Sequence, residues 1–268
     1  MAWPGNDTAA CVREHAARLG PFGTHLHLFA ELGSTSDEIA RLADLGAPHG
    51  TTVVAGAQTA GRGRHGHHWF SPPGSGLYLS MLLRTPAEPL LTLATGVAVA
   101  ESLRLTTHLS AELEWPNDVV VMVDGQRRKV AGILAERSTG PDGPPARIVL
   151  GVGINLRDSA WPPDLIGHAG SVEGLTGVSA DADTLLVEVL AALAARVDAL
   201  ARGKGTELRA RWQGLAPSSH GTRVSWSGPD GPSEGTSEGI DVDGALLVRT
   251  DSGLERLIGG EVRHLRRE

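Results

Sequence analysis

A nine-residue segment combines glycine, arginine, histidine and tryptophan in a way that suits an anionic ligand. It covers residues 61–69, reads GRGRHGHHW and shows neither a helical nor a strand period. Glycine lets a backbone approach a ligand closely, and arginine presents a fixed fork of donors to carboxylate or phosphate. We therefore predict a flexible loop that wraps an anionic ligand, with Trp69 as its apolar wall.

The same segment matches the G-x-G-x-x-G pattern of dinucleotide-binding folds, but its surroundings do not fit. A strand-like run at residues 52–57 precedes it, whereas residues 67–73 cannot open the helix that would hold a pyrophosphate. The chain also lacks the G-x-x-x-x-G-K-[ST] pattern, so any use of ATP falls outside the P-loop class. The alternative for this segment is a solvated basic loop or an RGG-like contact to nucleic acid.

Composition, charge and cysteine content limit the function classes. The chain has 268 residues, 41% hydrophobic and 21% charged, as expected for one substantial globular domain and a small one. Its net charge of −7 argues against a dedicated DNA-binding protein, because phosphate binding needs a basic face. The single cysteine, Cys11, indicates a reducing compartment, and no signal peptide or membrane-spanning run is visible. We therefore expect a cytoplasmic protein without nucleic-acid or membrane partners.

Strands and helices are expected on both sides of the loop. A helix should follow residue 34, where Thr35 and Glu38 have capping-box spacing. The dipeptide Asp124-Gly125 predicts a hairpin turn. Strands are expected at residues 26–28, 52–57, 76–83, 119–123, 129–136 and 148–156, with a Gly/Pro turn at 139–146. Two longer helices are expected at residues 93–105 and 186–200. One short helix is expected near the start, with Val12, Ala16 and Leu19 on one face.

The composition changes after residue 215. Short strands with Gly, Ser, Pro and Asp turns are expected at residues 222–226, 239–242, 245–250 and 254–258, which is a small β-barrel pattern. We therefore predict two domains, 1–216 and 217–268.

Several short motifs stand in a definite order along the chain. They are Ser34-Thr35, Gln58 with the 61–69 loop, Trp115-Pro116-Asn117-Asp118, the run KVAGIL at residues 129–134 and the run GVGINL at residues 151–156. This ordered set resembles the biotin–protein ligases over residues 31–265. Too few residues precede His25 for a DNA-binding module, so the chain is similar to the ligase-only class.

The resemblance implies a fold and an activity. The fold is α+β, with a mixed-sheet catalytic domain of the biotin/lipoate ligase type and a small C-terminal SH3-like β-barrel. The activity is ATP-dependent formation of biotinyl-5′-AMP, followed by transfer of biotin to a lysine in the biotin carboxyl carrier domain of an acetyl-CoA or acyl-CoA carboxylase. ATP, Mg²⁺ bound with the nucleotide, and biotin are the implied ligands, without a permanent metal site in the protein.

The resemblance also assigns roles to individual residues. Short hydroxyl and amide groups suit the neutral ureido head of biotin, and Lys129 can follow the charge that develops in the transition state. The implied biotin contacts are Ser34, Thr35, Ser36, Gln58, Arg62, Gly63, Arg64 and Lys129; the implied ATP or adenylate contacts are Arg64, His67, Trp69, Asn117, Asp118, Lys129 and Asn155; and the implied catalytic residues are Lys129, Arg64 and Arg62.

Each residue also has a plainer interpretation. The Ser-Thr pair can be a helix cap, the Trp-Pro-Asn-Asp run a tight turn, Lys129 a solvated strand residue and Trp69 part of the core. The histidine groups at 25 and 27 and at 65, 67 and 68 have no local carboxylate or cysteine that would complete a transition-metal site.

Three positions depart from the family pattern. Ser36 stands where asparagine is common, His67 where arginine or lysine is usual, and Glu114 where a basic residue is typical. Glu114 reverses a charge beside the implied nucleotide site, so it bears on ATP affinity or carrier docking. Two other functions stay open at this point: a lipoate or octanoate ligase or transferase of the same fold, and a non-catalytic biotin-binding module.

Overall fold

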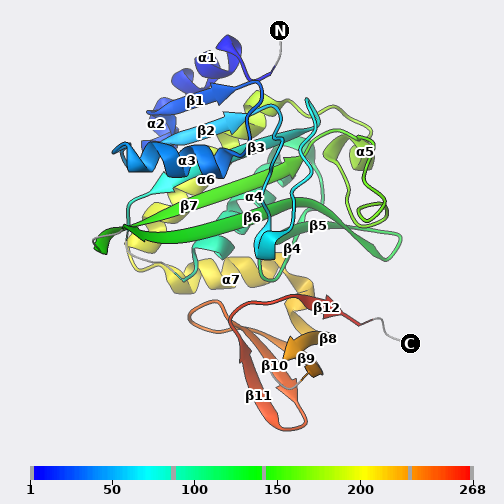
Figure 1. The fold of residues 1–268 in the computed structure, drawn as a ribbon. Coiled ribbons are helices and arrows are strands. Elements are labelled where there is room, and N and C mark those ends of the chain that lie inside the picture. The colour runs from blue at the N-terminus through cyan, green and yellow to red at the C-terminus, as the bar shows by residue number, and fades with distance from the viewer. Residues whose placement is uncertain (1–2, 86–88, 141–142, 229–230, 266–268) are drawn as a thin grey trace.

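A mixed seven-stranded sheet forms the larger part of the molecule, and a five-stranded antiparallel sheet follows it along the chain (Figure 1). The computed structural model describes residues 3–85, 89–140, 143–228 and 231–265. The strands of the large sheet are β1 (Leu26–Phe29), β2 (Thr52–Ala55), β3 (Gly76–Leu83), β4 (Glu112–Glu114), β5 (Asp118–Val123), β6 (Gln126–Gly140) and β7 (Gly143–Asn155). They lie in the order β1-β2-β3-β7-β6-β5-β4, with β1 parallel to β2 and the other neighbours antiparallel. The predicted α+β class with a mixed sheet is confirmed.

The two faces of this sheet carry separate apolar layers. Successive side chains of a strand point to opposite faces, so Leu79 and Met81 pack on one side and Leu82 on the other. The first face is covered by α4 (Leu91–Thr107), and α6 (Ala182–Ala201) packs against α4. Because α4 is apolar on nearly all sides, it lies buried between the sheet and α6.

The remaining helices lie around this core. The predicted single N-terminal helix is wrong in one respect, because it breaks at His15 into two helices that pack on α6. The helices near residues 172 and 205 were not predicted. The bounds are α1 (Asn6–Glu14), α2 (Ala16–Leu19), α5 (Val172–Thr176) and α7 (Gly205–Leu215), with short 3-10 turns η1 (Gly20–Gly23), η2 (Arg64–Gly66) and η3 (Pro217–Ser219). Among the described residues, none of these helices is long and apolar enough to cross a membrane.

Helix α3 (Thr35–Asp44) covers part of the second face. Its residues Ile39 and Ala43 pack with Val53, Leu82 and Val149 of the sheet in a second apolar cluster. The helix leaves the rest of this face open, over the middle of β3, β7 and β6, and the start of α3 borders that opening.

The predicted capping box at the start of α3 is wrong. Ser34 is the N-cap residue and its side chain makes no capping hydrogen bond. Glu38 instead pairs with Arg41, one turn further along the helix, at 2.6 Å. The hydroxyl of Thr35 instead hydrogen-bonds with Gln58, which follows β2, and with Ser80 of β3, so it is not available for the local contact that the spacing predicts.

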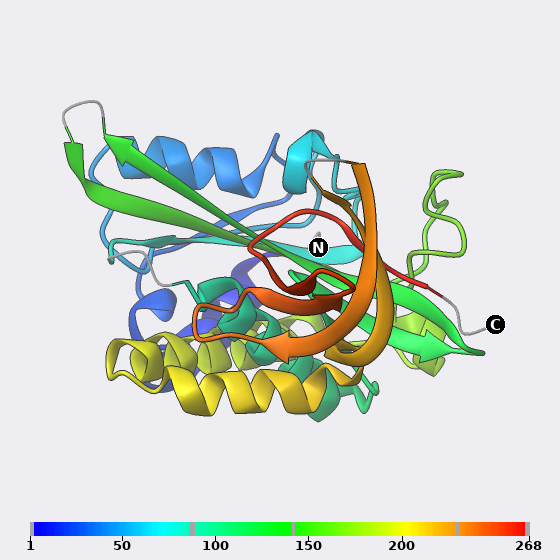
Figure 2. The same cartoon turned by 90° about the horizontal axis from the view of Figure 1, so that it is seen from below.

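The two hairpins of the large sheet test the turn predictions. Asp124 and Gly125 have φ values of +49° and +73°, as a tight hairpin turn requires, so this prediction is confirmed. The predicted turn at 139–146 is wrong, because β6 and β7 remain paired as far as Gly140 and Gly143. Figure 2 shows this hairpin extending past the neighbouring strands. Of that predicted turn, residues 141–142 lie outside the described residues.

The C-terminal sheet lies below α7 in Figure 1, with β12 on the side that faces the large sheet. Its strands are β8 (His220–Gly228), β9 (Gly231–Ile240), β10 (Leu246–Thr250), β11 (Gly253–Leu257) and β12 (Val262–His264), in the order β11-β10-β9-β8-β12. All neighbours are antiparallel, as an SH3-like barrel requires. The predicted strand at 239–242 is wrong in its bounds: β9 ends at residue 240, and Asp241 starts a turn by accepting hydrogen bonds from the backbone of Asp243 and Ala245.

Candidate active site

A cavity of about 650 Å³ opens on the second face of the large sheet, beside α3. It is lined by almost all of the predicted site residues: Thr35, Ser36, Gln58, Arg62, Gly63, Arg64, His67, Trp69, Asn117, Asp118, Lys129 and Asn155. Ser34 is the exception. It is buried, and its hydroxyl has no hydrogen-bond partner among the described residues.

Glycines of β6 and β7 form the floor of the cavity. A Cβ atom on Gly153 would lie 2.4 Å from Nε1 of Trp69, and one on Gly132 would lie 2.9 Å from the same ring. A Cβ atom on Gly151 would lie 3.1 Å from the hydroxyl of Ser36. Glycine inside a strand marks a place where another group comes close to the backbone, and here it leaves room for the Trp69 ring and the Ser36 hydroxyl.

The floor also gives the cavity a direction. Residues 151, 153 and 155 of β7 point to the same face, and the four-residue step between the first and the last covers roughly 13 Å. Gly151 lies next to Ser36, whereas Asn155 donates to the backbone carbonyl of Lys129 at 3.3 Å. The two ends of the cavity are therefore separated along β7, and they differ in charge.

The neutral end consists of Thr35, Ser36, Gln58 and Ser80. The backbone N–H and the hydroxyl of Thr35 both donate to Oε1 of Gln58, at 2.8 and 3.1 Å. The hydroxyl of Ser80 lies 2.8 Å from that of Thr35 and 3.1 Å from that of Ser36. The amide of Gln58 donates to Ser71 at 3.0 Å, which fixes its orientation. This end therefore presents prearranged, uncharged donors and acceptors.

The charged end consists of Arg64, Asn117, Asp118 and Lys129. The guanidinium of Arg64 donates to Oδ1 of Asn117 at 3.0 Å, and the amide of Asn117 donates to the carbonyl of Ile133 at 2.8 Å. Burial lowers the pKa of Arg64, although Asp118 and Glu261 oppose that effect. The group remains a cation at neutral pH, held in place by a strand-bound amide.

Lys129 and Asp118 form an ion pair at this end. The Lys129 ammonium lies 2.7 Å from Oδ1 of Asp118 and 5.4 Å from the centre of the Trp69 ring. Burial raises the pKa of Asp118 above its ordinary value, while the charge of Lys129 and its hydrogen bond lower it again. A buried carboxylate beside one lysine has oxygen lone pairs left for a further cationic ligand.

The 61–69 loop folds back on itself over the cavity. The N–H of Trp69 donates to the carbonyl of Gly61 at 2.9 Å, and the N–H of Gly63 donates to the carbonyl of His67 at 2.7 Å. A Cβ atom on Gly61 would lie 2.5 Å from the carbonyl oxygen of Trp69, so this position needs glycine. No helix follows the loop in residues 67–75, which agrees with the rejection of a dinucleotide-binding motif.

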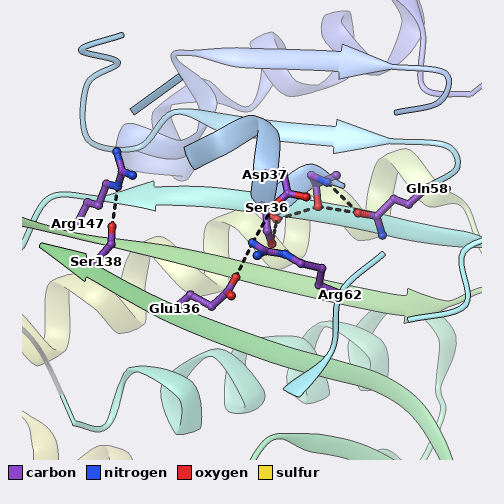
Figure 3. A network of polar contacts seen from close by, with 9 residues as sticks. Ser36, Asp37, Gln58, Arg62, Glu136, Ser138 and Arg147 are labelled. Atoms are coloured by element: carbon purple, nitrogen blue, oxygen red, sulfur yellow. Dashed lines mark hydrogen bonds and ion pairs between the residues drawn. The ribbon is translucent and has the colours of Figure 1, made fainter. Parts of the chain in front are cut away.

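Arg62 points to different partners from Arg64. Its guanidinium lies 2.7 Å from Oε2 of Glu136 on β6 and 3.2 Å from Oδ1 of Asp37 on α3 (Figure 3). The two arginines of the loop thus have different surroundings, since Arg64 lies with the charged end and Arg62 contacts two protein carboxylates.

The C-terminal sheet contributes directly to the cavity wall. Oε1 of Glu114 lies 2.6 Å from Nε2 of His264 and 3.4 Å from Nε of Arg127. His67 lies 3.6 Å from Glu261. Two of the three departures from the family pattern therefore have ionisable neighbours: Glu114 lies beside His264 and Arg127, and His67 lies beside Glu261.

Several lining residues were not predicted from the sequence. The alternating glycines at 151 and 153 and the single serine in the apolar strand β3 carried a usable signal, since each interrupts a strand pattern. Glu261 and His264 carried no signal in the sequence, because the residues that they contact come from distant parts of the chain. Among the described residues, no group of three or more His, Cys, Asp or Glu side chains is placed to hold a metal ion.

Comparison with known protein families fits this geometry. The model described as the Biotin/lipoate A/B protein ligase family matches residues 34–155, and the Biotin protein ligase C terminal domain matches residues 220–265. The first match spans both ends of the cavity, and the second spans the C-terminal sheet. They define the class as ligases of the biotin/lipoate type.

Individual relatives are more specific. A biotin–[acetyl-CoA-carboxylase] ligase of Mycobacterium tuberculosis is 31% identical and the alignment covers 95% of this chain and 94% of that protein. The corresponding Paracoccus denitrificans ligase is 32% identical, with 88% and 98% covered. A structure of biotin protein ligase from Aquifex aeolicus in complex with biotin and ATP has a TM-score of 0.77 and 29% identity, covering 91% of this chain and all of that one. The chain belongs to the biotin protein ligase family.

Proposed function

We propose that this chain is an ATP-dependent ligase that activates biotin as biotinyl-5′-AMP and transfers it to a lysine of a carrier protein. The observation that carries the proposal is the polarity of a single cavity, with neutral hydrogen-bonding groups at one end and Lys129, Arg64 and Asp118 at the other. Biotin has the same polarity, because a neutral ureido head and a carboxylate stand at opposite ends of an apolar chain.

The neutral end suits the ureido head. A ureido group offers two N–H donors and one carbonyl acceptor, and Thr35, Ser36, Gln58 and Ser80 offer both kinds of partner without a charge. The ring of Trp69 over the glycine floor gives the apolar middle of the ligand a flat wall. Ser34 belongs to this end through its place before Thr35, and its buried hydroxyl is free to accept or donate after a small shift.

The charged end suits acyl-phosphate chemistry. In the first step, a carboxylate oxygen of biotin attacks the α-phosphorus of ATP, and the bond from that phosphorus to the bridging oxygen breaks to release pyrophosphate. Lys129 lies where it can pair with the carboxylate and then with the oxygen that gains charge, and Arg64 can hold the phosphate side. In the second step, the carrier amine attacks the acyl carbon, loses its proton to solvent, and AMP leaves.

Mg²⁺ is expected to enter with the nucleotide. Magnesium is usually held by one or two carboxylates together with substrate phosphates. Asp118 provides a buried carboxylate whose cationic neighbours, among the residues that the structure describes, are Lys129 and Arg64, so the residues present fit such a shared site. When bound there, the ion would screen the phosphates from the approaching carboxylate.

The remaining assignments follow the same logic. Asn155 holds the backbone of Lys129 and Gly170 through its amide, so we assign it to support of the charged end. His67 and Asn117 are assigned to the adenylate side through Glu261 and Arg64. The predicted division at residues 216 and 217 falls between the end of α7 and the first strand of the C-terminal sheet, and we retain it.

The acceptor is proposed to be the biotin carrier domain of a carboxylase. The relatives from M. tuberculosis and P. denitrificans bear the name biotin–[acetyl-CoA-carboxylase] ligase. A lipoate or octanoate enzyme is not favoured, because a cavity end of hydroxyl and amide groups does not suit a fatty chain, and the C-terminal match is to biotin protein ligases.

The decisive experiment measures pyrophosphate release from ATP with and without biotin, followed by transfer of labelled biotin to a carrier domain. We expect biotin-dependent release, and labelling of one carrier lysine. Labelled lipoate serves as the competing substrate. Biotin binding without pyrophosphate release would establish the non-catalytic binding module instead, and preferential transfer of lipoate would establish the other acyl class.

A further inference from the structure

Arg62 joins two elements that border the neutral end of the cavity. Its guanidinium contacts Glu136 of β6 and Asp37 of α3 at 2.7 and 3.2 Å (Figure 3). Asp37 directly follows Ser36, and Glu136 lies two residues beyond Leu134 on the same face of β6. Because Ser36 and Leu134 line the cavity, the arginine is held beside the mouth of that end.

The contacts of Arg62 also fix the loop that carries it. The backbone of Arg62 bridges to that of His68, and the N–H of Trp69 donates to the carbonyl of Gly61, so the two sides of the loop are paired with each other. A displacement of Arg62 is therefore transmitted to Trp69, which lies on the glycine floor. The anchor for this loop on the α3 side is Asp37, and the anchor on the sheet side is Glu136.

The ion pairs of Arg62 with Asp37 and Glu136 are weak enough for the loop to open and close. The side chains of Arg62, Asp37 and Glu136 are 38%, 60% and 37% exposed. Half-exposed ion pairs are individually weak, and salt screens them further. Two carboxylates around one arginine hold the closed loop without locking it, so that ligand can enter and leave.

We propose that Asp37 and Glu136 are positioning residues that act through Arg62: they keep the loop closed over the head group of bound biotin and slow its escape. This inference rests on the proposed function, since it takes biotin as the ligand of the neutral end. It assigns to Arg62 a role in retention, which differs from the role of Arg64 at the charged end.

The test measures the dissociation rate of radiolabelled biotin after dilution into unlabelled biotin. Glu136→Gln and Asp37→Asn are each expected to raise that rate about two- to fivefold, and the double variant to raise it further. In these variants, the KM for biotin should rise by a larger factor than the factor by which the rate of pyrophosphate release at saturating biotin falls. Added salt should speed dissociation from the unmodified protein more than from the double variant. A conservative Glu136→Asp change is expected to restore part of the slow rate.

A background without the arginine separates this role from a general structural one. In Arg62→Met, further change of Glu136 to Gln should have no additional effect, because its partner is gone. Glu188→Gln is the matched control: it removes a two-bond ion pair with Arg18, neither residue lines the cavity, and the dissociation rate should not change.

Two failures can be told apart. If the unmodified protein neither binds biotin nor releases pyrophosphate, the proposed function is wrong. If it binds biotin but Glu136→Gln and the double variant release it at the original rate, the role of the two carboxylates is wrong. An equal effect of Glu136→Gln with and without Arg62 would also overturn the inference.

Discussion

The two ends of the cavity are built in different ways. The neutral end takes its groups from the start of α3, from β3 and from Gln58, which follows β2, and these groups hydrogen-bond to one another. The charged end draws on the 61–69 loop, on the turn before β5 together with the first residue of β5, and on β6. The first is a prearranged set of neutral groups, and the second brings charged groups together from three parts of the chain.

This difference separates binding from chemistry. Neutral hydrogen bonds between fixed groups stabilise substrate and transition state alike, whereas charges aimed at a reacting centre act mainly when charge develops. Changes at the neutral end should therefore affect the affinity for biotin, and changes at the charged end the rate of adenylation.

Lys129→Ala should slow adenylation with little effect on biotin binding. Loss of one preorganised donor to the transition state costs about 2–4 kcal/mol, or a rate decrease of about 30- to 1,000-fold. Pyrophosphate release and biotin binding are measured side by side. The matched control is Lys204→Ala, which removes a lysine paired with Glu207 at the surface. If Lys129→Ala released pyrophosphate at the original rate, Lys129 would have no part in adenylation.

Gly153→Ala should impair both functions, because the floor serves both ends. Its Cβ atom would lie 2.4 Å from the Trp69 ring, so the ring and the loop must move. Overpacking of this kind costs about 1–3 kcal/mol, which we expect to appear in the affinity for biotin and in the adenylation rate. Gly214→Ala in α7 is the control, since a Cβ atom there meets nothing within 4 Å. Unchanged biotin affinity would show that Trp69 does not wall the ligand.

Ser80→Ala should weaken biotin binding and leave the adenylation rate at saturating biotin nearly unchanged. The substitution removes one hydroxyl partner from both Thr35 and Ser36, at a cost of about 0.5–1.5 kcal/mol. Calorimetry of biotin binding gives the affinity. Ser102→Ala is the control, because the buried hydroxyl of Ser102 has no partner among the described side chains and backbone. A slower chemical step in Ser80→Ala would contradict the division between the two ends.

The smallest effect is expected from a change of pH, which should alter the rate of adenylation at the charged end but not binding at the neutral end. Burial raises the pKa of Asp118, so as the pH falls Asp118 is protonated earlier than an exposed aspartate, and Lys129 loses its charged partner. We expect adenylation to fall with decreasing pH, beginning at a higher pH than protonation of an exposed aspartate would cause, and Asp118→Asn, although slower throughout, to lack that component. Binding of the uncharged biotin alcohol should stay constant over the same range. Identical pH profiles for the two proteins would mean that Asp118 does not titrate in the reaction.

Local sequence determined much of this molecule. The apolar strand β3, the long helix α6 and the tight turn at Asp124-Gly125 follow from periodicity and turn chemistry, which depend on neighbours a few residues away. The order of the motifs around Gln58, Asn117 and Lys129 was enough to identify the family, and all three line the same cavity. Such features are set by residue types that act over short distances along the chain.

Tertiary structure decided the remaining features. The strand β9 has no apolar alternation of its own and forms because β8 and β10 supply its partners. The carboxylates that hold Arg62, and the contact of Glu114 with His264, join residues far apart in the sequence. The hydroxyl of Thr35 does not cap the helix as expected but hydrogen-bonds with Gln58 and Ser80. A polar group takes the partner that the packed sheet brings within reach, and that partner is defined only once the chain has folded.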